Sequence, residues 1–106
     1  MAAFRAGAEE SVPWRDAQTD AAGLRVPYAL GDFLVLRALY DSRGMAIAVK
    51  DAEMVAAQSQ LGATEGIFAG MEAAATVAAV TKLRESGWLA GDQEVLLLIT
   101  SSGLKQ

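Results

Sequence analysis

Apolar residues along the chain fall into two kinds of run, some with helical spacing and some continuous. The run over residues 33–40 is apolar nearly all round, which is typical of a helix buried on most sides. Asp32 is placed to cap the start of this helix, and Gly44 lies where it should end. Further along, Asp51 is placed to cap a second helix, whose end is bracketed by Gly62 and Gly66.

A third helix is predicted from about Met71 to Ser86, where Gly87 stops it. Its many alanines give it a slender surface that other backbone segments can approach closely. A shorter helix over residues 2–10 is also expected, and Pro13 prevents it from continuing.

Two continuous apolar runs, residues 45–49 and 95–99, predict short strands, the second buried on both faces. The second run leads into Thr100-Ser101-Ser102-Gly103, a pattern suited to the ligand-binding end of a strand in an α/β sheet. A simple polar turn is the alternative interpretation of these four residues. Because two short strands do not form a stable sheet alone, the fold class is a partial three-layer α/β piece, mostly helical.

Composition narrows the function classes. The 106 residues are enough for one small domain, which we take to be incomplete, and 53% of them are hydrophobic. A net charge of −4 argues against nucleic-acid binding, and no apolar run is long enough to span a membrane. With no cysteine or histidine, the chain lacks the ligands of common zinc sites and the usual Ser-His or Cys-His nucleophile pairs. We therefore expect a cytoplasmic protein with no metal and no catalytic residue of its own.

Four motifs, in order from about residue 14 to the end, resemble the carboxyl-terminal segment of the threonine synthase family. These are pyridoxal-phosphate enzymes of the tryptophan-synthase-β-like group (fold type II). The matching stretches are Trp14–Pro27, Gly31–Leu39, Glu65–Phe68 with Glu72–Ala75, and Thr100–Lys105. Each motif is weak alone, but their order and spacing over most of the chain make the resemblance specific.

The resemblance implies that the parent enzyme binds pyridoxal phosphate and converts O-phosphohomoserine and water to threonine and phosphate. It assigns Thr100 the hydrogen bond to the cofactor's pyridine nitrogen, with Ser101 and Ser102 lining the same turn. It also places Glu72 near the cofactor, although a glutamate at a helix start is in any case favoured by the helix dipole. The chain departs from the family pattern at four positions, namely Lys50, Met71, Ala73 and Ser101.

The family's cofactor-attaching lysine and glycine-rich phosphate loop belong to the upstream part of the enzyme, and neither has a match here. The chain has only Lys50, Lys82 and Lys105. Lys82 is expected to be a solvated helix-end cation, and the other two flank strand ends. We therefore expect that the isolated chain is inactive and binds no cofactor. Its partners would be the remainder of the parent enzyme and further copies of itself.

Two other interpretations stay open at this point. The chain could be a free-standing, non-catalytic module that self-associates or docks on an enzyme through a sheet edge. It could also belong to a threonine or serine dehydratase-like lyase, although the ending Thr100–Lys105 resembles threonine synthase more closely.

Overall fold

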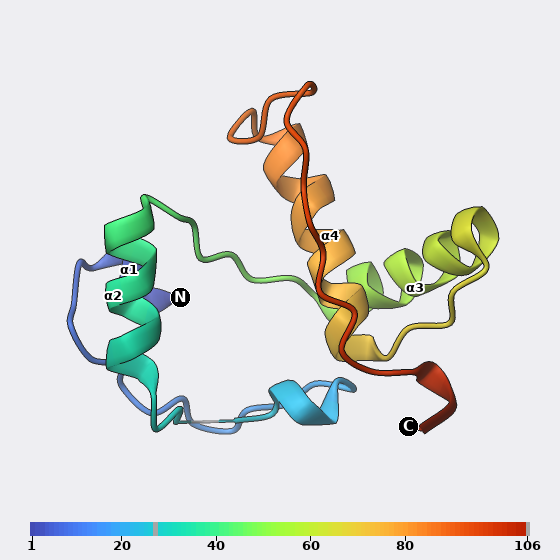
Figure 1. Ribbon diagram of the computed structural model, residues 1–106. Coiled ribbons are helices and arrows are strands. Elements are labelled where there is room, and N and C mark those ends of the chain that lie inside the picture. Colours follow the sequence, from blue (N-terminus) through green and yellow to red (C-terminus); the bar gives the residue numbers. More distant parts are fainter. Residues whose placement is uncertain (27, 106) are drawn as a thin grey trace. The chain divides into compact units, whose positions relative to one another are not determined.

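The structure, a computed structural model, describes residues 1–26 and 28–105 (Figure 1). Pro27, which closes the first family motif, lies outside the described residues. The helices are α1 (Ala2–Arg5), α2 (Asp32–Ser42), α3 (Asp51–Glu65) and α4 (Met71–Glu85), with 3-10 turns at Ala22–Leu24 and Gly103–Lys105. The chain divides into two compact units, Met1–Gln18 with Arg25–Ala48, and Thr19–Leu24 with Val49–Gln106.

The first unit holds α1 against α2. The ring of Phe4 stacks on that of Tyr40, with centroids 5.7 Å apart, and the Tyr40 hydroxyl donates to the Ala8 carbonyl oxygen at 2.5 Å. The predicted helix over 2–10 is wrong beyond Arg5. Gly7 has a φ of +69°, a left-handed conformation that ends the helical path.

The start of α2 is fixed by a carboxylate, although not as predicted. Gly31 occupies the N-cap position, and Asp32 lies in the first turn. Oδ2 of Asp32 accepts hydrogen bonds from the amide and hydroxyl of Ser11 at 2.6 and 2.7 Å. These bonds stabilise the ionised form and hold the pKa of Asp32 below its ordinary value.

At the other end of α2, the helix ends just before the predicted Gly44, and Arg43 takes a left-handed conformation with a φ of 54°. The Gly44 amide still donates to the Leu39 carbonyl at 2.8 Å and satisfies one terminal acceptor of the helix.

The apolar helix was expected to be buried on most sides, and this is wrong for the described chain. Leu34 and Val35 are 60% and 59% exposed, whereas Leu36 is buried. A 106-residue chain has too little other structure to cover all sides of such a helix.

In the second unit, α3 and α4 pack through small side chains. Ala57 on α3 contacts Ala74 and Ala78 on α4, and all three are buried. Met54, which is 2% exposed, contacts Met71 beside this alanine seam. The predicted helix limits are confirmed, since α3 ends before a left-handed Gly66 and α4 ends one residue before Ser86.

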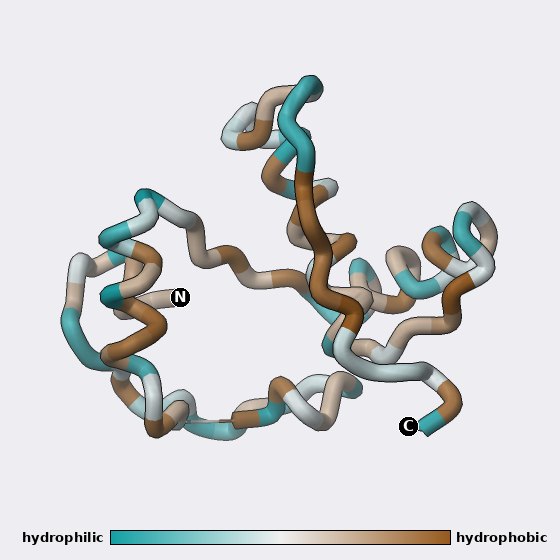
Figure 2. The backbone as a smooth tube through the Cα atoms, in the orientation of Figure 1, coloured by the Kyte–Doolittle hydropathy of each residue, from teal (hydrophilic) through white to brown (hydrophobic). Residues whose placement is uncertain are grey.

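The two predicted strands are absent from the part of the chain that the structure describes. Residues 45–49 and 95–99 are extended but have no ladder, and the single bridge, between Ala69 and Ser102, is isolated. A strand needs hydrogen bonds to a neighbour, and these two segments provide none for each other. Leu96 and Leu98 are 86% and 68% exposed, so burial on both faces is also wrong here. Figure 2 shows this segment as a continuous hydrophobic stretch.

Among the described residues, no helix combines the length and apolarity that crossing a membrane requires.

Candidate functional site

The extended C-terminal segment is tied to both ends of α4. At the far end, the Arg84 guanidinium donates to the carbonyl oxygens of Gly91 and Gln93, each at 3.2 Å. At the near end, the Gly70 amide donates to the Ser101 carbonyl at 3.0 Å. From Gly70 to Arg84 the helix rises about 21 Å, and eight extended residues reach about 26 Å. The segment therefore runs antiparallel to α4 and delivers Thr100 to the helix's N-terminal end (Figure 1).

The terminal turn is locked onto the link that precedes α4. The Gly103 amide donates to the Phe68 carbonyl at 2.9 Å, and Ser102 forms the bridge with Ala69. Gln58 of α3 reaches the same link, since its Nε2 donates to the Ala69 carbonyl at 2.7 Å. These bonds hold the terminal turn beside the link between α3 and α4.

The three hydroxyl residues of this turn differ in their environments. Thr100 is exposed, and its hydroxyl has no hydrogen-bond partner among the described residues. The Ser101 hydroxyl oxygen is buried and has no partner there either. The Ser102 hydroxyl accepts from the Leu104 amide at 3.3 Å. Successive side chains of an extended segment point to opposite faces, so Thr100 and Ser101 serve different surroundings.

Glu72 lies in the first turn of α4, two residues after Gly70. Its Oε1 accepts a hydrogen bond from the Gly23 amide at 2.7 Å. The structure therefore brings Glu72 and the hydroxyl turn to the same end of α4. It also gives Glu72 a protein partner 49 positions earlier that sequence reasoning missed.

A second missed residue is Asp51, which the sequence predicts only as a helix cap. Lys50 occupies the N-cap position of α3 instead, and Asp51 binds the segment before Ala21. Its Oδ1 and Oδ2 accept from the Thr19 hydroxyl at 2.5 Å and the Asp20 amide at 2.8 Å. Thr19, Ala21 and Gly23 all belong to the first family motif, but the sequence alone does not indicate that this motif contacts Asp51.

Lys82 is not a solvated cation as predicted. Its Nζ lies 3.3 Å from Oε2 of Glu53 on α3, and both side chains are about one-third exposed, at 34% and 36%. The pKa of Glu53 is lowered, first by the hydrogen bond from the Lys50 amide at 2.6 Å and then by Lys82. The pair joins α3 to α4.

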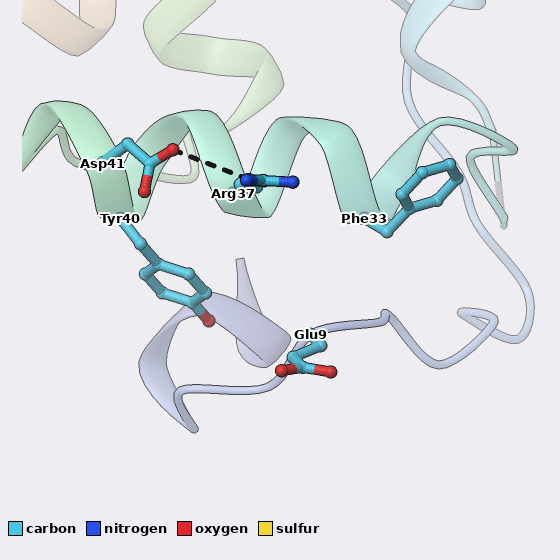
Figure 3. Close-up of a pocket in the computed structure, with 5 residues that line it drawn as sticks. All are labelled: Glu9, Phe33, Arg37, Tyr40 and Asp41. Carbon is cyan, nitrogen blue, oxygen red and sulfur yellow. Dashed lines mark ion pairs between the residues drawn. The ribbon is translucent and has the colours of Figure 1, made fainter.

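The first unit contains a separate hollow of about 380 Å³ (Figure 3). It is lined by Glu9, Phe33, Arg37, Tyr40 and Asp41, and none of these is a predicted site residue. Arg37 and Asp41 form an ion pair at 3.7 Å, with side chains 81% and 74% exposed. Exposed pairs of this kind contribute little to stability.

The described residues include no group of three or more acidic, histidine or cysteine side chains arranged to hold a metal ion. The polar groups at the N-terminal end of α4 are hydroxyls, backbone groups and the Glu72 carboxylate. Such groups can orient an organic cofactor through hydrogen bonds to its ring.

Comparisons with known proteins identify a family of enzymes that use an organic cofactor. The model of the pyridoxal-phosphate dependent enzyme family matches residues 1–101. The chain is 36% identical to threonine synthase of Methanocaldococcus jannaschii and 33% identical to that of Methanosarcina acetivorans. Each match covers 97% of this chain and 25% of the relative. Threonine synthase of Mycobacterium leprae is 31% identical over 83% of the chain and 24% of its own length. The chain thus spans about a quarter of the length of these relatives.

Proposed function

Because the chain belongs to the family of pyridoxal-phosphate-dependent enzymes, we propose that it is the C-terminal part of a threonine-synthase-like enzyme. One observation carries the proposal: an extended apolar segment anchored along α4 ends in an exposed Thr100 whose hydroxyl has no partner among the described residues. The relatives named threonine synthase and the terminal motif support the same assignment.

In the parent enzyme, the reaction would be the conversion of O-phosphohomoserine and water to threonine and phosphate. Pyridoxal phosphate, when bound, supplies an electron sink that activates the carbon skeleton of an amino acid. Thr100 would hydrogen-bond the pyridine nitrogen. A neutral hydroxyl leaves that nitrogen unprotonated, which moderates the electron sink and favours elimination and replacement.

The neighbouring serines would support this contact in different ways. Ser102 holds the turn through the Leu104 amide. Ser101 stands where the family prefers glycine, and its buried hydroxyl oxygen lacks a protein partner. A buried polar atom of this kind is costly unless a ligand, a water or another part of the enzyme satisfies it.

The isolated chain would be inactive. Lys82 is engaged by Glu53 at 3.3 Å, while Lys50 precedes α3 and Lys105 lies in the terminal 3-10 turn. None matches the family's cofactor-attaching lysine, and the phosphate loop has no counterpart in the sequence. A cytoplasmic location, expected from composition, is part of the same proposal.

A chimeric enzyme tests this function. The matching quarter of the Methanocaldococcus jannaschii threonine synthase is replaced by this chain, and phosphate release from O-phosphohomoserine is measured. Thr100→Ser should keep most of the activity, whereas Thr100→Val should lower kcat by about tenfold, the effect of one lost hydrogen bond. Thr64→Val, which removes an exposed hydroxyl on α3, is the matched control and should change nothing. An active chimera in which Thr100→Val equals the control would contradict the assigned role.

A free-standing docking module is the second candidate, favoured by the high exposure of Leu96 and Leu98. The genomic reading frame separates the two candidates. Continuous upstream codons for a lysine and a glycine-rich phosphate loop would support the enzyme part, and a stop codon immediately upstream would support the module.

A further inference from the structure

The segment Thr19–Leu24 is fastened to two helices by two carboxylates. Asp51, the first residue of α3, accepts from the hydroxyl of Thr19 at 2.5 Å and from the amide of Asp20 at 2.8 Å. Each oxygen of the carboxylate takes one of these bonds. This two-point attachment fixes both the position and the direction of the chain at this place.

The second carboxylate fastens the other end of the segment. Oε1 of Glu72 accepts from the Gly23 amide at 2.7 Å. A β-carbon on Gly23 would lie 2.9 Å from Oε1 and 3.1 Å from Cγ of Glu72. A larger residue at position 23 would therefore force the Glu72 side chain to shift from the place where it accepts the Gly23 hydrogen bond.

Between the two attachments, Ala21 packs between α3 and α4, beside the alanine seam. It is 0% exposed and packs against Met54 and Met71. The amide of Leu24 donates to the Ala21 carbonyl at 2.9 Å, which closes the 3-10 turn on top of this contact. Thr19–Leu24 is thus a third layer over the start of α4, and its small residues are needed for the fit.

The same first turn of α4 holds the terminal hydroxyl turn through Gly70 and Ser101. Only one residue separates Gly70 from Glu72. The start of α4 is therefore held from two directions, by Thr19–Leu24 through Glu72 and by the Thr100 segment through Gly70.

We propose that Asp51 and Glu72 are positioning residues of the cofactor site, which fix the first turn of α4 through Thr19–Leu24 and thereby set the place of Thr100. This inference rests on the proposed function and deepens it. It changes the expected role of Glu72 from a neighbour of the cofactor to a residue that acts through Gly23. Position 72 therefore requires a side chain that accepts a hydrogen bond from the Gly23 amide, and a negative charge is not needed.

Paired substitutions in the chimeric enzyme test this role, with the cofactor's dissociation constant and absorbance maximum as readouts. Glu72→Gln keeps an acceptor for the Gly23 amide and should change the constant little. Glu72→Ala should weaken binding by about tenfold, as loss of an orienting partner does. Gly23→Ala should have a similar effect, and the double variant should be no worse than Glu72→Ala, because truncation at 72 removes the clashing atoms.

Glu85→Ala, at the exposed far end of α4, is the matched control and should bind the cofactor normally. If Glu72→Gln is as damaging as Glu72→Ala, and Gly23→Ala adds to both, Glu72 contacts the cofactor through its charge and the proposal is overturned.

A readout in the 106-residue chain separates this proposal from the proposed function. Amide hydrogen exchange should be faster at Gly23 in Glu72→Ala, and also at Gly70, whose partner is the Ser101 carbonyl. If Gly70 keeps its protection, the start of α4 is not held by Glu72, and the proposal fails even if the chimera is active. Thr19→Val removes one donor to Asp51 and gives the same test with a smaller perturbation. An inactive chimera combined with faster exchange at Gly70 would overturn the enzyme assignment. It would still support the conclusion that Glu72 holds the first turn of α4.

Discussion

Gly103 lies so close to Phe68 that a β-carbon at position 103 would stand 2.2 Å from Cε1 of the ring. The Gly103 amide also donates to the Phe68 carbonyl at 2.9 Å. The terminal turn therefore packs backbone against ring face, and the glycine is required by space rather than by its φ angle. This contact holds the Thr100 segment beside α4.

Gly103→Ala should lower the free energy of unfolding by about 1 kcal/mol or more, because the ring must leave its place to admit a methyl group. Urea unfolding measures the loss. Gly91→Ala is the control, since a β-carbon there meets nothing within 4 Å. The cost of Gly103→Ala should shrink in a Phe68→Ala background, and an unchanged cost would show that the ring is not the obstacle.

The folded chain should become less stable as the pH is lowered through the acidic range. The pKa values of Asp32 and Glu53 are both lowered in the folded chain by hydrogen bonds from Ser11 and from the Lys50 amide. A lowered pKa means that the stabilisation is fully present above the ordinary carboxyl pKa of about 4 and is lost as the pH drops below it. Thermal unfolding between pH 6 and about 2.5 measures this.

Ser11→Ala should flatten the acid side of that profile, because Asp32 then loses its side-chain donor. Ser59→Ala, on the exposed face of α3, should leave the profile unchanged. An identical acid slope in all three proteins would remove Asp32 from the explanation.

The ion pair between Lys82 and Glu53 should contribute modestly, about 0.5 kcal/mol, because both side chains are about one-third exposed. A double-mutant cycle with Lys82→Met and Glu53→Gln isolates the coupling, and glutamine still accepts from the Lys50 amide. The exposed pair Arg37–Asp41, at 3.7 Å, serves as the comparison and should show coupling near zero. Equal coupling energies in the two cycles would contradict the expectation that the less exposed pair contributes more.

The isolated chain should self-associate. Leu96 and Leu98 lie on an extended segment without a strand partner among the described residues, at 86% and 68% exposed. Such a segment offers both apolar surface and unpaired backbone groups to a second copy. Light scattering at high micromolar concentration should give at least a dimer mass.

Leu96→Glu should shift that mass toward the monomer, because it places a charge within the apolar stretch. Leu30→Glu replaces an equally exposed leucine outside the stretch and should leave the mass unchanged. A monomer mass for the unsubstituted chain would rule out this association.

The helices were largely predictable because their signals are local. Gly66 ends α3 in a left-handed conformation, and α4 begins at the expected Met71. The two predicted strands failed because a strand depends on hydrogen-bonding neighbours and not on its own sequence alone. Residues 95–99 are apolar and so predict a strand, yet pairing depends on neighbours that the described residues do not provide.

The sequence indicates where the candidate site residues lie along the chain, but not the long-range bonds between them. The place of Thr100 at the end of an extended apolar run follows from the sequence, and so does a glutamate at the start of α4. The bond from Gly23 to Glu72 spans 49 positions and leaves no periodic signal that one sequence can reveal. The same holds for Thr19 and Asp51, which are 32 positions apart.

The most direct test of the account is a pyridoxal-phosphate titration of the purified 106-residue chain, followed by borohydride trapping and mass spectrometry. We predict no stoichiometric adduct, because this chain contains the proposed Thr100 contact but has no match to the family's cofactor-attaching lysine or phosphate loop. A single trapped lysine at Lys50, Lys82 or Lys105, at one cofactor per chain, would contradict it and show that the chain forms a cofactor site of its own.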